Sequence, residues 1–415
     1  MKKNVHHVVV RSGRKEAEPD LEIPIADDIA SVPGTPLRER DVSFFSREYP
    51  LESQTIEKGA DRVWIWSVYT KEASEFRKQH DSRVKPLVAE AKVSGDLSPT
   101  GQPDQQDDIT EAIRKKAWGM GFGEVGFTKF DRRYVFASKK RWSKFEHAIC
   151  LAYEQDYEKT QSIPSMDAEE THYGTYEIEG KIAIDLAAYI RSKGYRAQIH
   201  NPSDHSASVI AMFVAAGLGQ LGANGQLLSP HFGSRSRLMI ITTDAPVVYD
   251  QPEDYGINKF CEMCQVCVNR CPGRALVKDK VWWRGTEKNK LIYDRCRPVM
   301  ARYEGCGVCM KVCPIQKYGM KPVMEHYVST GEILGKGSHN LEGYEIRDKG
   351  YFGPGELPHF DRELFEMPHG SREEWLFEQF KNKVAKDGKP SQEDLEHFAQ
   401  SVDEAVHHKY THKDE

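Results

Sequence analysis

The sequence predicts a mixed α/β protein, of the α+β kind, with a cysteine-rich module following its core. Helical and strand-like patterns alternate between residues 107 and 246, which indicates an α/β core. Eight of the nine cysteines lie between Cys261 and Cys313. The chain has 415 residues, 39% of them apolar and 29% charged, which is typical of a globular protein with two or three domains.

Charge and hydropathy exclude several classes of protein. The chain has 58 basic and 63 acidic residues and a net charge of −5, without a long basic block, so we expect no nucleic-acid partner. No apolar run is long enough for a transmembrane helix. The first thirty residues have no apolar run of signal-peptide length. We therefore expect a cytoplasmic protein; the alternative is a secreted mature chain from which the signal has been removed.

The elements of the core follow from periodicity and capping residues. Asp108 or Thr110 begins a helix after a linker-like stretch. The clearest helix has apolar residues at helical spacing and ends before Gly194, a residue suited to a left-handed cap. We predict strands at 123–129, 147–153, 195–200 and 238–243, and helices at 108–119, 177–193 and 206–217. Two further helices are predicted near the C-terminus, at 372–386 and 392–408.

The first cysteine run has the spacing of a bacterial ferredoxin. Cys261, Cys264, Cys267 and Cys271 form C-x2-C-x2-C-x3-C-P. Three thiolates two residues apart can surround one 4Fe-4S cluster, whereas the fourth ligates a neighbouring cluster. The run therefore predicts two clusters and the transfer of single electrons.

The second run, Cys306, Cys309 and Cys313 before Pro314, lacks one close cysteine, and Cys296 is the obvious substitute. A structural zinc site or a disulfide scaffold would be the alternative, but zinc prefers paired C-x2-C knuckles and disulfide scaffolds belong to short secreted domains. We assign one cluster to Cys261, Cys264, Cys267 and Cys313, and the other to Cys271, Cys296, Cys306 and Cys309. The isolated Cys150 is expected to be a buried small apolar residue.

A glycine-rich segment lies between the predicted helix at 206–217 and the cysteines. It reads A-G-L-G-Q-L-G-A-N-G-Q-L-L-S-P-H-F-G-S-R-S-R-L over residues 216–238. A dinucleotide-binding G-x-G-x-x-G sits between a strand and the helix that it opens. Here the glycines follow a helix and lead to turn signals at Asn224-Gly225 and Ser229-Pro230. Backbone without side chains can instead lie against a large flat ligand.

This segment, followed by the two cysteine runs, resembles the cobalamin-dependent reductive dehalogenase family and its relative epoxyqueuosine reductase. The resemblance covers residues 173–314. It implies a nitroreductase-like core that holds a corrinoid, beside an inserted two-cluster ferredoxin module. The residues that it places at the corrinoid are Gly217, Gly219, Gly222, Asn224, Gly225, Leu228, Ser229, Pro230, His231, Phe232 and Arg237.

The resemblance also implies catalytic residues. The segment 189–197 is similar to the family's entry into a strand, and counting back from it places Tyr176 at the position of a proton-donating tyrosine, with Tyr173 as the second choice. A guanidinium nearby would favour the phenolate. We expect Arg235 in that role rather than Arg237. Asn201 takes the polar position beside the tyrosine.

The expected organisation is an N-terminal arm and packing region (1–106), a cobalamin-binding core (107–255), a 4Fe-4S module (256–320) and a C-terminal extension that completes the core and substrate cavity (321–415). The leading hypothesis is reductive removal of halide from an organohalide, with electrons from an external reduced ferredoxin or flavodoxin-like donor. The alternatives are an epoxyqueuosine reductase acting on tRNA and a non-catalytic electron carrier. The epoxyqueuosine reductase family has an aspartate as the acid in its active site, whereas the expected residue here is a tyrosine.

Overall fold

The computed structural model of the chain describes residues 70–365, except 105, 107, 136–138, 284 and 285, together with 4–5, 21–22, 24–28, 391, 393–394 and 397. The predicted helix at 372–386 lies outside the described residues, as does most of the one at 392–408. At the N-terminal end, β1 (Asn4–Val5) pairs with β2 (Leu21–Glu22).

The core is a four-stranded sheet in the order β3-β4-β8-β5, with every neighbouring pair antiparallel. Its strands are β3 (Glu124–Lys129), β4 (His147–Glu154), β5 (Ala197–His200) and β8 (Ser236–Thr243). They match the predicted strands to within two residues at each end. Mixed α/β architecture is therefore confirmed.

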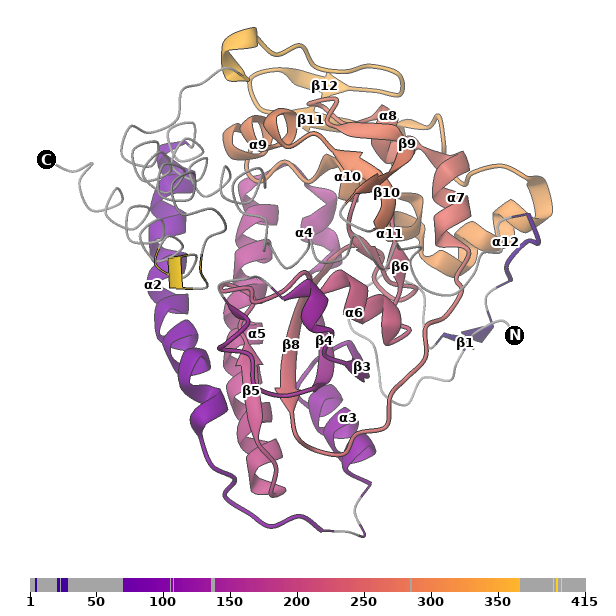
Figure 1. The fold of residues 1–415 in the computed structure, drawn as a ribbon. Helices are drawn as coiled ribbons and strands as arrows, with labels where there is room; N and C mark the ends of the chain where they lie inside the picture. Colours follow the sequence, from indigo (N-terminus) through magenta and orange to yellow (C-terminus); the bar gives the residue numbers. More distant parts are fainter. Residues whose placement is uncertain are drawn as a thin grey trace, which may run out of the picture.

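Helices cover both faces of this sheet (Figure 1). Since successive strand residues point to opposite faces, Ile149 and Leu151 pack toward α3 (Ile109–Gly119) and α5 (Met166–Ser192), whereas Ala148, Cys150 and Ala152 pack toward α6 (Ile210–Ala215). Cys150 is fully buried, as predicted. Three short helical segments flank this core: η2 (Ser94–Asp96), η3 (Arg132–Tyr134) and α4 (Tyr157–Gln161).

Helix α5 begins eleven residues before the predicted start at 177. Ser165 caps it by accepting a hydrogen bond from the Ala168 backbone N–H at 3.2 Å. Its first half is too polar for periodicity to reveal, because that half faces another polar helix rather than the sheet core. Gly194 follows α5 with φ +90°, which agrees with the predicted left-handed cap.

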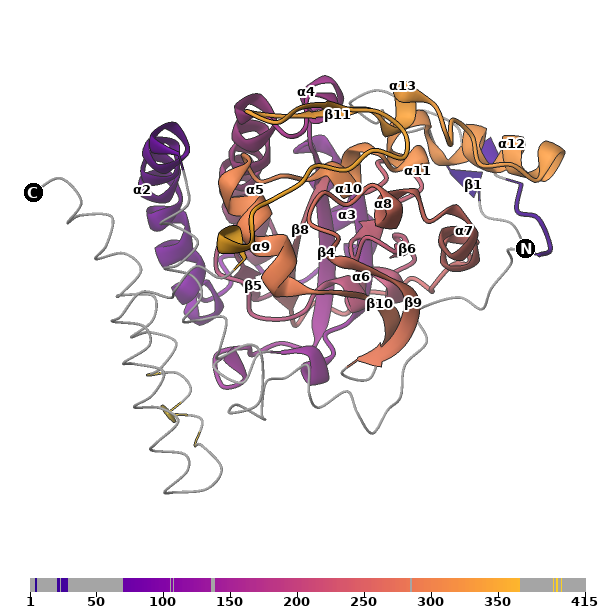
Figure 2. The same cartoon turned by 90° about the horizontal axis from the view of Figure 1, so that it is seen from above.

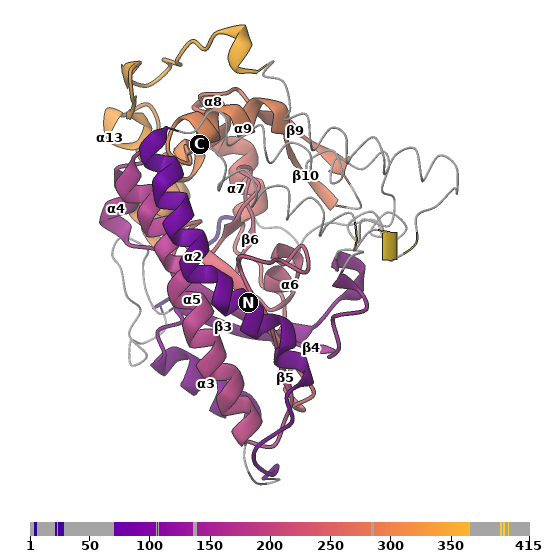
Figure 3. The same ribbon diagram turned by 90° about the vertical axis from the view of Figure 1, so that its left-hand side faces the viewer.

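That partner helix is α2 (Lys71–Val93), which sequence reasoning missed. Figures 1 and 3 show α2 running beside α5. Its composition is dominated by charged residues and it contains Pro86, so it lacks the apolar periodicity that identifies a helix. Thr70 caps its start by accepting from the Ala73 backbone N–H. It brings charged side chains to the N-terminal half of α5.

The cysteine-rich part of the chain gathers at one end of the sheet with its own buried core (Figures 1 and 2). Its cysteines lie on or next to short helices. The elements are α7 (Ile257–Cys264), α8 (Val266–Asn269), β9 (Leu276–Trp283), β10 (Thr286–Leu291), α9 (Tyr293–Arg302), α10 (Val308–Lys311), α11 (Pro314–Tyr318), α12 (Met320–Thr330), α13 (His339–Glu342), β11 (Tyr344–Ile346), β12 (Gly350–Phe352) and η5 (Arg362–Leu364).

Among the helices that the structure describes, none is long and apolar enough to cross a membrane.

Candidate metal centre and active site

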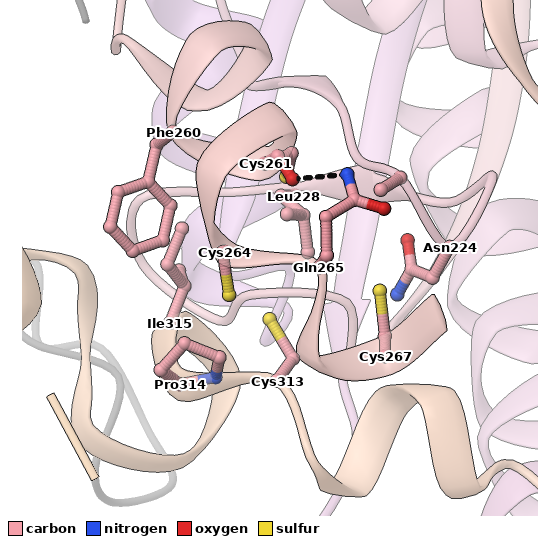
Figure 4. Close-up of a pocket in the computed structure, with 11 residues that line it drawn as sticks. Asn224, Leu228, Phe260, Cys261, Cys264, Gln265, Cys267, Cys313, Pro314 and Ile315 are labelled. Atoms are coloured by element: carbon pink, nitrogen blue, oxygen red, sulfur yellow. Dashed lines mark hydrogen bonds between the residues drawn. The ribbon is translucent and has the colours of Figure 1, made fainter. Parts of the chain in front are cut away.

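Four thiols line one cavity in the cysteine-rich region (Figure 4). They belong to Cys261, Cys264, Cys267 and Cys313, the set that the ferredoxin spacing assigned to the first cluster. Apolar and polar side chains complete the wall: Ala223, Asn224, Leu228, Phe260, Gln265, Pro314 and Ile315. We call this the first sulfur cavity.

A sharp change of chain direction brings the first three of these thiols together. Helix α7 ends at Cys264 because Gln265 adopts the left-handed conformation, with φ +53°. The Gln265 side chain then donates a hydrogen bond to the Cys261 carbonyl at 2.7 Å. The next helix, α8, carries Cys267. Pro314 occupies the first turn of α11 and so fixes Cys313 at its N-cap.

The other four cysteines form a second group. Burial raises the pKa of the Cys306 thiol, and the nearby Cys296 and Cys271 sulfurs raise it further. Burial likewise raises the pKa of Cys309, where Cys306, Cys296 and Cys271 act in the same direction. The Cys271, Cys296, Cys306 and Cys309 sulfurs therefore lie within electrostatic range of one another. Cys313 also acts on Cys309, so the two groups adjoin.

The donor set fits iron–sulfur clusters. Burial raises the pKa of every thiol of the first sulfur cavity, to about 12 for Cys313. Such thiols become thiolate ligands only when bound metal supplies positive charge. Within the described residues, no three His, Cys, Asp or Glu side chains converge as closely as a single metal ion requires. The four thiols instead surround a space.

The glycine-rich segment forms a hairpin after α6, with β6 (Gln220–Leu221) antiparallel to β7 (Leu227–Leu228). The turn closes through a hydrogen bond from the Gly225 N–H to the Gly222 carbonyl, at 2.9 Å. Asn224-Gly225 is therefore a turn, as predicted. The segment does not have the strand-to-helix arrangement of a dinucleotide-binding loop.

Most glycines of this segment are required by the packing of the chain against itself. A Cβ on Gly217 would lie 2.4 Å from the Gln251 carbonyl oxygen, and one on Gly219 would lie 2.4 Å from that of Leu228. A Cβ on Gly233 would lie 2.6 Å from the Gln316 Cα. Of the predicted corrinoid-contacting glycines, Gly225 has open space at its Cβ position. At Gly217, Gly219 and Gly233, close contact with the chain's own backbone therefore explains why glycine is required.

Other residues assigned to the corrinoid lie in two places. Asn224 and Leu228 line the first sulfur cavity. Ser229 is buried, donates to the Glu124 carboxylate and accepts from the backbone N–H of His231 at 2.9 Å. The Phe232 ring is fully buried against Gly123. Two buried polar atoms of this segment, Gln220 Nε2 and Ser234 Oγ, have no hydrogen-bond partner among the described residues, which suits a polar ligand.

Tyr176 lies half-buried on α5 in a group of aromatic and charged side chains from α2, α5 and β8. The Arg237 guanidinium carbon is 5.3 Å from the centre of the Tyr176 ring. The His172 ring centre lies 5.3 Å away and that of Tyr173 lies 6.1 Å away. We call this group the tyrosine cluster; its members are Arg77, His80, Glu169, His172, Tyr173, Tyr176, Glu177 and Arg237.

Arg235 does not take the position expected for it. Its side chain is fully buried, forms an ion pair with Glu154 and lies 5.0 Å from the centre of the Tyr157 ring. Arg237 is two residues further along, opposite Tyr153 within the paired strands β4 and β8, and it reaches Tyr176 instead. The second choice from the sequence is thus the arginine found beside the tyrosine.

Asn201 is buried and lies against α5 one turn beyond Tyr176. Its amide nitrogen is 3.4 Å from the position a Cβ would take on Gly180. Its side-chain oxygen accepts a hydrogen bond from the Ser203 N–H at 2.8 Å. The structure therefore brings Asn201 to the helix that carries Tyr176, at Gly180, and fixes it by a local turn.

Apart from Arg237, sequence reasoning missed the charged members of the tyrosine cluster. Glu169 contacts the His172 Nδ1 at 3.2 Å and Arg77 at 3.5 Å. Burial lowers the pKa of His172 to about 4, and Arg237 lowers it in the same direction. The spacing Glu169, His172, Tyr176 along one helix was a readable signal. Arg77 was not readable, because α2 itself was not predicted.

The tyrosine cluster adjoins the second group of cysteines. A Cβ on Gly305 would lie 2.1 Å from a Glu169 carboxylate oxygen, and Gly305 immediately precedes Cys306. Glu169 contacts His172, whose ring neighbours Tyr176. The cluster therefore lies between the sheet core and the cysteine-rich region.

Parts of the chain are similar in sequence to known proteins. No family model matches the chain. It is 30% identical over 220 residues to a tetrachloroethene reductive dehalogenase of Desulfitobacterium hafniense, covering 49% of this chain and 39% of that protein. The enzyme of that name from Sulfurospirillum multivorans is 32% identical over 182 residues, covering 41% and 36%. An epoxyqueuosine reductase of Lactococcus garvieae is 36% identical over 118 residues, covering 26% and 32%.

Among solved structures, the catabolic reductive dehalogenase NpRdhA superposes with a TM-score of 0.60 at 23% identity, covering 83% of this chain and 55% of that one. The same protein in complex with 3-bromo-4-hydroxybenzoic acid gives 0.56 at 22%, covering 86% and 55%. The chain thus matches well under two thirds of the length of these relatives. It is a homologue of the reductive dehalogenases over about half of its own length, as its motifs indicated, and it shares their fold.

Proposed function

We propose that the chain is a reductive dehalogenase, an oxidoreductase that replaces the halogen of an organohalide with hydrogen. The carbon–halogen bond breaks, halide leaves, and a carbon–hydrogen bond forms with two electrons and one proton. The observation that carries this proposal is Arg237 over the ring of Tyr176, in a chain whose cysteine-rich region also holds a cavity lined by four thiols. Sequence similarity to tetrachloroethene reductive dehalogenases supports it.

In this proposal the eight cysteines of the two groups hold two 4Fe-4S clusters that carry one electron at a time. The segment from Gly217 to Ser234 would hold the corrinoid, with Gln220 and Ser234 offering polar atoms to it. When bound, a corrinoid supplies a Co(I) centre that is a strong nucleophile and reductant toward carbon–halogen bonds. The protein orients that group and tunes its electronics.

Tyr176 supplies the proton from its hydroxyl. The Arg237 guanidinium, 5.3 Å from the ring centre, stabilises the phenolate that remains after transfer. Asn201, one turn away on the facing loop, provides a polar group at the same helix. The neutral His172 leaves Arg237 as the positive charge that faces the ring.

The electrons come from an external reduced ferredoxin or flavodoxin-like donor, and the substrate is a small organohalide. One related structure is a complex with 3-bromo-4-hydroxybenzoic acid, which makes brominated phenols a sensible first panel. Chlorinated ethenes form the second panel, because the curated relatives are named for chloroethenes.

The test is anaerobic reconstitution of the full chain with iron, sulfide and cobalamin, followed by halide release with a strong chemical reductant. Halide release by the unaltered chain but not by Tyr176→Phe would support the proposal. Activity only on an epoxyqueuosine-containing tRNA stem loop would assign the chain to the reaction of its other relatives. Cluster loading without corrinoid uptake or turnover would leave an electron carrier.

A further inference from the structure

One buried hydroxyl in the cysteine-rich region has no use in the function proposed above. Tyr344, on β11, is 1% exposed, and its hydroxyl oxygen has no hydrogen-bond partner among the described residues. Leaving a hydroxyl buried without a partner destabilises a protein, because the group loses its hydrogen bonds to water and gains none in return. A buried hydroxyl of this kind is explained if a bound group accepts its hydrogen bond.

The side chain of Tyr344 is held rigidly. The Arg270 guanidinium carbon lies 4.8 Å from the centre of its ring, and the Phe352 ring lies 5.9 Å away on the paired strand β12. Arg270 is itself 1% exposed and donates to the carbonyls of Glu342 and Phe352, each at 3.1 Å, and to that of Glu356. The ring therefore cannot turn to find another partner.

This clamp holds Tyr344 next to the second group of cysteines. Arg270 directly precedes Cys271 in the chain. The buried core that contains Tyr344 also contains Cys261, Cys264 and Cys313, and Cys267 and Cys306 both pack against it. Burial raises the pKa of Tyr344; Arg270 opposes this, whereas the sulfurs of Cys306 and Cys271 add to it. The contact that ties Tyr344 to the second group is the Arg270 guanidinium over its ring, because the next residue in the chain is Cys271.

We propose that the Tyr344 hydroxyl donates a hydrogen bond to a sulfur atom of the second cluster and thereby raises that cluster's reduction potential. Reduction adds negative charge to the cluster, so a donor on its sulfur stabilises the reduced form. Tyr344 is a tuning residue that acts through the cluster. The inference rests on the assignment of Cys271, Cys296, Cys306 and Cys309 to one cluster.

The test uses the full chain loaded with both clusters and without corrinoid or substrate, so that it does not depend on turnover. Redox titration followed by electron paramagnetic resonance gives one midpoint potential for each cluster. The signal of the second cluster is identified by its loss in Cys306→Ser. In Tyr344→Phe, which keeps the ring, we expect the second cluster's potential to become more negative while that of the first is unchanged.

Tyr327→Phe is the matched control. Its ring is also buried in this region, but its hydroxyl already donates to Asp28 at 2.8 Å. It should leave the second cluster's potential where it is. Equal potentials in Tyr344→Phe and the unaltered chain, with both clusters present, would overturn the inference and leave the proposed function standing.

A second measurement covers the case in which Tyr344→Phe fails to hold its second cluster. In the unaltered chain, the reduced second cluster should show magnetic coupling to a hydroxyl proton that exchanges rapidly in D₂O, besides the slowly exchanging amide proton of Ala275, which donates to Cys271 Sγ at 3.3 Å. Absence of that coupling would overturn the inference without any variant. Failure of the unaltered chain to take up a second cluster would overturn the two-cluster assignment itself, and the inference with it.

Discussion

The first sulfur cavity and the tyrosine cluster are built from different kinds of chain segment. The cavity takes three of its thiols from seven consecutive residues and the fourth from the start of α11. The tyrosine cluster combines α2, α5 and β8, which are far apart in the sequence. Loss of one cysteine should therefore abolish cluster binding in the first sulfur cavity. Loss of one side chain from the tyrosine cluster should lower activity only in part.

The largest effect is expected from the ligands. Cys306→Ser should remove the second cluster, so iron should fall from about eight to about four per chain and turnover should cease, because a missing cluster breaks the electron path. Cys150→Ala is the control, since Cys150 is buried in the sheet core away from both groups. Full iron content in Cys306→Ser would contradict the assignment.

Next in size is loss of the proton donor. Tyr176→Phe should keep iron, sulfide and cobalt yet lower turnover by about 10²- to 10⁴-fold, the range for one acid catalyst. Tyr173→Phe removes the neighbouring hydroxyl, on a ring whose centre is 6.1 Å from that of Tyr176, and should change turnover little. Rates are measured by halide release. A larger loss of turnover in Tyr173→Phe than in Tyr176→Phe would identify Tyr173 as the proton donor.

The two arginines give a third test, because the structure gives them different roles. Arg237→Gln should lower turnover about tenfold, since it removes a charge beside the tyrosine. Arg235→Gln should reduce the free energy of unfolding by about 3 kcal/mol, because it leaves the Glu154 carboxylate buried without its charge partner. Urea denaturation and halide release, run on both variants, separate the two effects.

The smallest effect concerns pH. His200 is buried, shares hydrogen bonds with the hydroxyls of Ser206 and Thr242, and burial lowers its pKa to about 3. At pH values between about 3 and 6.5, the unfolded chain binds a proton at His200 more readily than the folded chain does. The free energy of unfolding therefore falls as pH falls through this range. From pH 6.5 to pH 5 this amounts to about 2 kcal/mol.

Urea denaturation at both pH values measures this loss. His200→Gln should remove most of it while keeping a polar side chain between the same two hydroxyls. An unchanged pH dependence in the variant would show that other histidines carry the effect.

The same contrast explains what could be predicted from the sequence. Within each cysteine run the thiols are separated by two or three residues on local turns, so their closeness follows from spacing. The strands of the sheet follow from apolar runs such as 147–153. The choice between Arg235 and Arg237 depends on strand register and side-chain direction, which spacing does not determine. Helix α2 was missed because its polar face packs on another polar face, and Arg77 and His80 were missed with it.

The glycine-rich segment lies between these two cases. Its turn at Asn224-Gly225 was readable, because that dipeptide favours a tight turn. The reason for two other glycines could not be predicted from the sequence. Gly217 is required because the Gln251 backbone lies against it, and Gly233 because the Gln316 backbone does. Those contacts are long-range in the sequence.

The central claim is that two iron–sulfur clusters and a corrinoid share this one chain. The most direct measurement is metal analysis of the full chain after anaerobic reconstitution and removal of unbound cofactor. We expect about eight irons, about eight sulfides and about one cobalt per chain. About four irons, or cobalt that washes away from a chain whose clusters are complete, would contradict the account.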